Sequence, residues 1–205
     1  MKEKIKLQTN TKSKSHLHQL IKASLFTTLI SIGAFFIIPI KPVSITLQSL
    51  FVLLAGVFLT PSYITLSISA YILLGLAGLP VFAGKAGGLE YVFKPSFGYI
   101  IGFLFAGLFI SKTLRMIKNK NIINIFLIFL TASIIIYLFG LPYMYFALKQ
   151  FANKTLPLNK IFTAGMIPFI PGDLVKAVCA TLITKKLIKE VNIDSSYVFP
   201  PLTVP

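Results

Sequence analysis

The sequence predicts an all-α integral membrane protein, a bundle of six transmembrane helices with both termini in the cytoplasm. Hydrophobic residues make up 56% of the 205 residues, against about 45–50% in a typical soluble domain. They gather in long runs separated by short connectors, and the mean hydropathy is +0.85. The formal net charge is +15. Because most basic residues stand between the apolar runs, we interpret this charge as membrane topology and expect no nucleic-acid partner.

The chain divides into a basic N-terminal tail (1–19), a membrane domain (20–187) and a C-terminal tail (188–205). We expect the tail to be disordered up to about Ser15, because it is rich in lysine and poor in apolar residues. A span of about 20 apolar residues crosses a hydrocarbon core of about 30 Å. The predicted spans are 20–38, 47–60, 62–79, 97–110, 122 to about 145 with a break at 140–142, and 161–187.

The connectors predict the orientation of these spans. Lysines and arginines are concentrated in the N-terminal tail, in the connector 111–121 and after residue 184. Cytoplasmic loops carry an excess of these residues, so both ends of the chain are expected in the cytoplasm. The linker 39–46 and the glycine-rich loop 81–98 then lie at the outer face, together with the start of the last span. A multi-pass protein in the lipid bilayer is the expected outcome.

The last span is interrupted by Pro168, Pro171 and Gly172 and contains two charged residues, Asp173 and Lys176. Proline removes a backbone donor and favours a break, so we predict that a helix restarts with Asp173 at or near its N-cap. Lys176 follows three residues later, on nearly the same face. Ionisable residues inside a span mark functional sites, which predicts a polar binding site here. The alternative is a helix end that Asp173 caps while Lys176 reaches the headgroups.

Three other regions provide candidate site residues at the outer face. Gly87 and Gly88 permit close backbone approach to a ligand or simply a flexible turn. Tyr99 either faces a ligand or belongs to an aromatic belt at the interface. Gln48 either contacts a ligand or ends a helix.

No motif predicts catalysis. There is no Walker A sequence, no HExxH and no cluster of cysteines and histidines with metal spacing. The two histidines, His16 and His18, lie in the basic tail, and Cys179 stands alone among small residues of the last span. Because no nucleophile and base can be paired, we predict a protein that is not an enzyme and has no cofactor or bound metal.

The first span carries a ridge of small residues at spacings of three and four: Ala23, Ser24, Thr27 and Thr28. Small side chains let two helices approach closely in a membrane. The ridge predicts a contact, either within the chain or with a partner.

Four segments in order carry a family signature: 46–48 (Thr-Leu-Gln), 78–84 (Gly-Leu-Pro-Val-Phe-Ala-Gly) with Gly87 and Gly88 beyond it, 95–103, and 168–176 (Pro-Phe-Ile-Pro-Gly-Asp-Leu-Val-Lys). Together they resemble the BioY family of biotin transporters, the substrate-binding S components of energy-coupling-factor transporters. The resemblance covers roughly residues 25–186.

The resemblance implies a protein of the bacterial plasma membrane that captures biotin from outside. It also implies work with a transmembrane coupling subunit and two cytoplasmic ATPases. Carried over by motif, Asp173 would take a ureido N–H of biotin and Lys176 a biotin oxygen. Phe82 and Tyr99 would cover the rings, the 81–88 loop would form a lid, and the small-residue ridge would face the coupling subunit.

Three features depart from the family pattern. The small-residue ridge of the first span is alanine-rich in the family and is partly Ser and Thr here. Residues 93–99 read Phe-Lys-Pro-Ser-Phe-Gly-Tyr where the family usually has Gly-Pro-Thr-Gly-Gly-Tyr, and Lys85 stands where glycine is common. Two alternatives to the ATP-driven S component remain at this point. One is a solitary biotin carrier that needs no ATPases, and the other is a noncatalytic membrane scaffold whose basic face binds anionic lipid or a partner.

Overall fold

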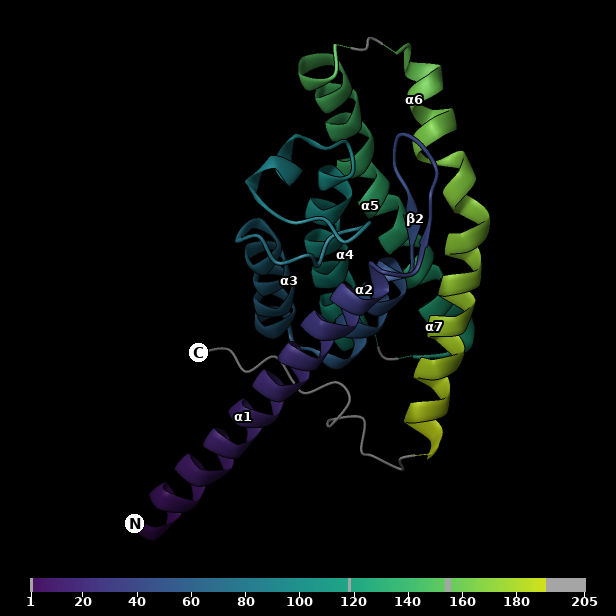
Figure 1. Ribbon diagram of the computed structural model, residues 1–205. Coiled ribbons are helices and arrows are strands. Elements are labelled where there is room, and N and C mark those ends of the chain that lie inside the picture. Colours follow the sequence, from purple (N-terminus) through teal and green to yellow (C-terminus); the bar gives the residue numbers. More distant parts are fainter. Residues whose placement is uncertain (1, 118, 154–155, 191–205) are drawn as a thin grey trace.

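The computed structural model describes residues 2–117, 119–153 and 156–190, and the side chains of 16–187 within them. The chain is a helical bundle with a small hairpin and a 3-10 segment at one end (Figure 1). The helices are α1 (Lys2–Gly33), α2 (Gln48–Phe58), α3 (Pro61–Leu76), η1 (Leu89–Phe93), α4 (Phe97–Met116), α5 (Ile122–Phe151), α6 (Leu158–Gly165), η2 (Ile167–Phe169) and α7 (Ile170–Glu190). Strands β1 (Ile37–Ile38) and β2 (Ile45–Thr46) pair antiparallel.

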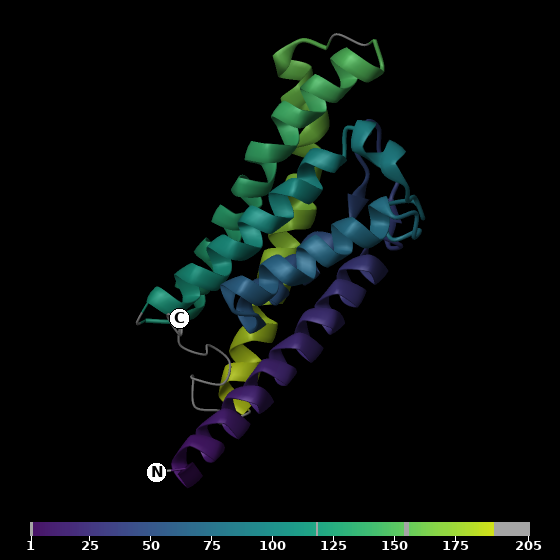
Figure 2. The ribbon, with the colours of Figure 1, turned by 90° about the vertical axis from the view of Figure 1, so that its left-hand side faces the viewer.

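Helix α2 lies at the centre of the bundle. It packs against α1, α4 and α7, while α1 also packs on α3, and α5 packs on α4 and α7. The N-terminal end of α1 and the C-terminal end of α7 point to the same end of the bundle, opposite the hairpin and η1 (Figures 1 and 2). Helices far apart in sequence therefore meet around α2.

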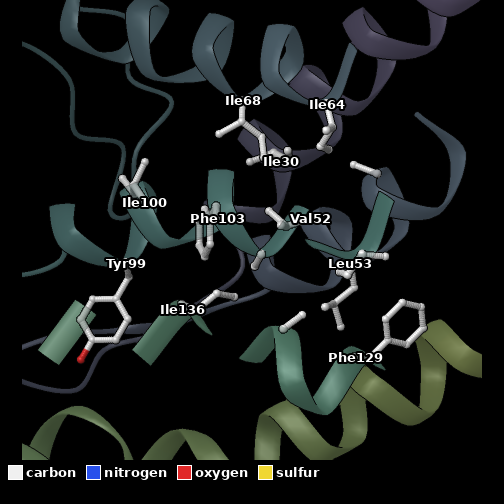
Figure 3. Packing of buried hydrophobic residues seen from close by; sticks show 14 of the residues in the cluster. Ile30, Val52, Leu53, Ile64, Ile68, Tyr99, Ile100, Phe103, Phe129 and Ile136 are labelled. Carbon is white, nitrogen blue, oxygen red and sulfur yellow. The ribbon is translucent and has the colours of Figure 1, made fainter. Parts of the chain in front are cut away.

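The core is a continuous layer of aliphatic and aromatic side chains contributed by α1 to α5 and α7. Figure 3 shows part of it, where side chains from different helices point toward one another. Its labelled members are Ile30, Val52, Leu53, Ile64, Ile68, Tyr99, Ile100, Phe103, Phe129 and Ile136. Toward one side this layer ends at Tyr99, Ile100, Phe103 and Ile136, which also line a cavity.

The predicted six-helix membrane bundle is confirmed, with helices of unequal length. Within the described residues, three segments are apolar and long enough to cross a membrane: Phe97–Met116, Ile122–Phe151 and Leu158–Leu187. Helices α2 and α3 are apolar but shorter, with 11 and 16 residues. At 1.5 Å per residue α2 is about 16 Å long, so it spans only part of a core of about 30 Å.

Two expectations for the first span are wrong. Helix α1 already begins at Lys2, inside the tail that was expected to be disordered up to Ser15, and it ends at Gly33 rather than at residue 38. It ends early because the chain turns into the β1–β2 hairpin. The N–H of Leu47, at the start of α2, donates to the carbonyl of Gly33 at 3.1 Å. Any Cβ at Gly33 would lie 3.0 Å from the backbone nitrogen of Gln48, so glycine permits this close approach.

The predicted break in the fifth span is also wrong. Helix α5 continues through Pro142 to Phe151. Pro142 removes one backbone N–H donor from the helix. A break in the helix would leave several more backbone groups without partners, because the apolar surroundings offer none. In a membrane the continuous helix therefore costs less free energy than an interrupted one.

The last span restarts earlier than predicted. Helix α6 ends at Gly165, the short η2 follows, and α7 begins at Ile170. Asp173 therefore lies in the first turn of α7, near the start of the helix as predicted, but not at the N-cap itself. The side chain is free to bond across the bundle because the N-terminus of α7 begins three residues before it.

The last described residues, up to Glu190, still belong to α7, so this helix continues into the region predicted as the C-terminal tail. The remainder of that tail lies outside the described residues.

The 81–98 loop, at the same end of the bundle as the hairpin, is ordered by backbone hydrogen bonds. In the 81–98 loop, Phe82 and Ala86 bond to each other around a tight turn at Gly84 and Lys85, whose φ angles are +76° and +57°. A left-handed φ favours glycine, so Lys85 adopts a backbone conformation that a glycine would adopt at lower cost. The N–H of Gly88 donates to the carbonyl of Gly75 at 2.7 Å, so the loop is tied to the end of α3.

Replacing Gly102 by alanine is expected to destabilise the bundle by about 1–3 kcal/mol, because the core offers no room for a methyl group. A Cβ at Gly102 of α4 would lie 2.9 Å from the Cα and carbonyl oxygen of Ile136 in α5. Backbone cannot move aside as a side chain can. Thermal unfolding in detergent measures the effect. At Gly172 a Cβ would meet only Ile45, at 3.9 Å, so Gly172→Ala is the matched control. Equal stability of the two variants would contradict the prediction.

Candidate binding site

A cavity lies between the hairpin, the 81–98 loop and helices α2, α4, α5 and α7. The space between its lining atoms measures about 530 Å³, part of it open to solvent. Its walls combine aromatic and aliphatic side chains with a few polar groups, as small-molecule sites do. The lining residues are Val43, Ser44, Thr46, Gln48, Ser49, Ala83, Tyr91, Ser96, Tyr99, Ile100, Phe103, Ile136, Tyr137, Phe169, Asp173 and Lys176.

Asp173 and Lys176 line this cavity as an ion pair. Lys176 Nζ lies 3.0 Å from Asp173 Oδ1, and both side chains are largely buried. The same ammonium donates to Ser49 Oγ of α2 at 2.9 Å, and the Tyr137 hydroxyl of α5 donates to Asp173 Oδ2. The pair is thus held by three helices, which satisfies the condition that a buried charge be paired and hydrogen-bonded.

The pair lines the cavity and retains unused hydrogen-bonding capacity. A carboxylate offers about four lone-pair sites, and Asp173 uses one on each oxygen in these contacts. An ammonium has three donors, of which Lys176 uses two. A ligand can therefore donate two N–H groups to Asp173 and accept one bond from Lys176. This combination suits a group that carries N–H donors beside a carbonyl oxygen.

Gln48 lies where the sequence predicted it, at the start of α2 and in the cavity wall. Its amide is already engaged, because Oε1 accepts from Thr46 Oγ1 at 2.9 Å and Nε2 donates to the Tyr71 hydroxyl. That hydroxyl in turn donates to the carbonyl of Val81 at 3.3 Å. Gln48 thereby connects the hairpin, α3 and the 81–98 loop around the cavity.

Tyr99 is a lining residue and not part of an aromatic belt. Only 6% of it is exposed, and its hydroxyl donates to the carbonyl of Gly165 at 2.8 Å. Its ring stacks on Phe169, with ring centroids 6.0 Å apart. Both rings line the cavity, so α4 and η2 provide an aromatic surface beside Asp173.

Three of the predicted site residues do not line the cavity but lie behind the residues that do. Phe82 is fully buried and stacks on Tyr91, with ring centroids 4.3 Å apart, so Tyr91 is the ring that reaches the cavity. Gly87 packs against the backbone of Leu79, and Gly88 has a φ of +97° and bonds to α3. All three shape the loop that covers the cavity, but none is among its lining residues.

Tyr91, in η1, closes the cavity from the loop side. Its hydroxyl accepts from Ser96 Oγ at 3.0 Å, and Ser96 also lines the cavity. Burial raises the pKa of the Tyr91 hydroxyl, an effect that the hydrogen bond from Ser96 partly offsets. The phenol is therefore neutral at physiological pH and presents an apolar face with a polar edge.

Tyr137 and Ser49 are site residues that the sequence analysis did not identify. Tyr137 holds Asp173 from α5, and Ser49 holds Lys176 from α2. A signal existed for each, since Tyr137 places a hydroxyl in the middle of an apolar run and Ser49 adjoins Gln48. Neither pattern says which of the other helices the side chain meets.

A second hollow, of about 930 Å³, lies between α5 and α6. Tyr137 borders both spaces, and no charged side chain lines the second one. An open apolar groove between membrane helices offers no polar group to orient a ligand apart from two tyrosines, so the cavity with Asp173 is the candidate site.

The small-residue ridge on α1 divides into two faces. Ala23 and Thr27 are buried within the chain, where Thr27 Oγ1 lies 3.0 Å from both the carbonyl and the hydroxyl oxygen of Ser67 in α3. Ser24 and Thr28 are exposed, and their hydroxyls donate to carbonyls of their own helix. The internal contact is confirmed for Ala23 and Thr27. An external contact stays a prediction for Ser24 and Thr28.

Comparisons with known proteins agree on one family. The model of the BioY family matches residues 4–193. The chain is 38% identical over 177 residues to a Thermotoga maritima protein named "Biotin transporter BioY", covering 84% of this chain and 97% of that protein. It is 35% identical over 170 residues to a "Probable biotin transporter BioY" of Lysinibacillus sphaericus, covering 83% and 86%.

A solved structure is also similar. It is described as the S-component for biotin from an ECF-type ABC transporter, and its TM-score with this chain is 0.66 at 32% sequence identity. The match covers 86% of this chain and 94% of that chain. The fold similarity thus extends over nearly the whole bundle.

Proposed function

Because this chain belongs to the BioY family, we propose that it binds biotin in the cavity at Asp173 and acts as the S component for biotin uptake across the membrane. The observation that carries the proposal is the buried Asp173–Lys176 pair with its unused bonding capacity. The ureido group of biotin has two N–H donors and one carbonyl oxygen, which is the complement of that capacity.

The arrangement of the cavity suggests how the ring system is bound. Asp173 accepts the ureido N–H groups, and Lys176 donates to the ureido oxygen. Tyr99, Phe103 and Phe169 provide the apolar surface for the fused rings. Gln48 and Phe82 act indirectly, by holding the hairpin and the Tyr91 ring in place.

We propose further that the chain works with a transmembrane coupling subunit and two cytoplasmic ATPases in the bacterial plasma membrane. The description of the solved relative as part of an ECF-type ABC transporter supports this assembly. The exposed Ser24 and Thr28 on α1 are the side chains at which the coupling subunit would approach closely. The bundle is then oriented with the N-terminal end of α1 in the cytoplasm.

The proposal is tested by binding of labelled biotin to the purified protein in detergent. We expect saturable binding of one biotin per chain, which unlabelled biotin displaces and a vitamin without a ureido ring does not. A folded sample without saturable binding would overturn the assignment.

Replacing Tyr137 by phenylalanine is expected to weaken biotin binding by about tenfold. The substitution removes the donor to Asp173 Oδ2 and leaves the ring in place. A hydrogen bond to a charged group contributes about 1.5–3 kcal/mol, part of which water or ligand can replace. Equilibrium binding measures the loss, and Tyr143→Phe is the matched control, since its hydroxyl bonds to the carbonyl of Val92 away from the ion pair. An equal effect of both substitutions would contradict this role of Tyr137.

A further inference from the structure

The charges that line the cavity cancel. Asp173 and Lys176 are its two ionised lining residues among those described, and they pair at 3.0 Å. Biotin carries a carboxylate at the end of its tail and is an anion at neutral pH. An anion gains little from a cation whose charge is already compensated, so the tail requires a different partner.

Lys94 is a cation at the loop side of the cavity. It follows η1 directly, and its backbone N–H donates to the carbonyl of Tyr91 at 3.0 Å. Its ammonium lies over the Tyr91 ring, 5.1 Å from the centroid. Because Phe82 is fully buried and stacks on the same ring, the surface on which the ammonium rests is fixed.

The ammonium of Lys94 is also available. Its side chain is exposed, and none of the carboxylates whose side chains the structure describes forms an ion pair with it. Its attraction to the Tyr91 ring is weaker than a charge-assisted bond to a carboxylate, and the two can coexist. The Tyr91 ring lines the cavity beside Ser96. Lys94 is not itself a lining residue, and its ammonium rests on this ring at the border of the cavity.

We propose that Lys94 binds the tail carboxylate of the substrate at the mouth of the cavity, while Asp173 and Lys176 bind its ureido ring. The inference rests on the proposed function and assigns a second, anionic subsite to it. The subsite makes the protein prefer the free acid over a neutral tail. Two further exposed lysines, Lys41 and Lys85, stand on the connectors around the cavity and serve as internal comparisons.

The test compares biotin with its primary amide, which has the same rings but a neutral tail. We expect wild type to bind biotin about five- to tenfold more tightly than the amide. Lys94→Gln is expected to weaken biotin binding by the same factor and to leave binding of the amide unchanged. Unchanged amide binding also shows that the variant is folded. Lys94→Arg is expected to keep the preference for the acid.

The matched controls are Lys41→Gln and Lys85→Gln, which remove one charge each from neighbouring connectors. Both are expected to retain the preference for the acid. An equal loss in all three glutamine variants would overturn the subsite in favour of a general electrostatic effect, and so would a full preference in Lys94→Gln. Absence of saturable biotin binding by wild type would instead overturn the proposed function, and the subsite with it.

Discussion

Replacing Asp173 by asparagine is expected to lower the affinity for biotin by about 100-fold or more. Asparagine keeps the shape of the side chain but has one acceptor oxygen, and its NH₂ group would face a donor, either the Tyr137 hydroxyl or a ureido N–H. The substitution also leaves Lys176 without its counter-charge in a buried position. A site built to hydrogen-bond a group loses most of its affinity when one partner cannot bond. Equilibrium binding of labelled biotin measures the loss.

The matched control for this prediction is Glu90→Gln. Glu90 lies in η1 and is exposed, and it does not line the cavity. The substitution makes the same change of charge, so it distinguishes an effect at the binding site from an effect of the protein's overall charge. Its affinity is expected to stay within about twofold of wild type, as for most surface substitutions. Wild-type affinity in Asp173→Asn would refute the assigned site.

Replacing Lys176 by methionine is expected to destabilise the folded protein by about 3 kcal/mol and to abolish biotin binding. Removing one partner of a buried ion pair leaves an uncompensated charge, which costs about 3–5 kcal/mol. Here the carboxylate of Asp173 keeps the Tyr137 donor, which places the cost at the lower end. A reduced thermal unfolding temperature in detergent is the readout.

The double variant Asp173→Asn with Lys176→Met separates stability from function. It removes both charges, so the penalty for an unpaired one disappears, and the unfolding temperature is expected to recover most of the loss. Binding is expected to remain absent, since neither ligand-facing group is restored. A double variant as unstable as the single one would show that the ion pair is not the origin of the loss.

The parts of the fold that could be predicted are those governed by local apolar pattern. The start of α4 at Phe97 and of α5 at Ile122 agree with the predicted spans, because each follows a polar or proline-containing connector. The wrong boundaries have a different cause. Pro142 stays inside α5, and α1 ends at Gly33, because contacts with other helices and the lack of water decide between alternatives that the local sequence leaves open.

The same distinction applies to the site. Asp173 and Lys176 could be predicted because charges inside an apolar span are costly wherever they lie. Tyr137 and Ser49 could not, since a hydroxyl in a span is often satisfied by its own helix, as Thr181 is by the carbonyl of Ala177. Long-range packing also determines that Tyr91 lines the cavity while Phe82 lies behind it.

The continuity of α1 links the two ends of the molecule. One helix runs from Lys2 to Gly33, carries the exposed Ser24 and Thr28 along its length, and ends at the carbonyl that holds Leu47, where the hairpin over the cavity joins α2. A displacement of α1 therefore also displaces the hairpin that covers the cavity. Thermodynamic reciprocity then sets a condition. A subunit that binds α1 more tightly when the cavity is occupied must raise the affinity for the vitamin by the same factor. A subunit that binds α1 more weakly when the cavity is occupied must lower that affinity and so favour release of the vitamin.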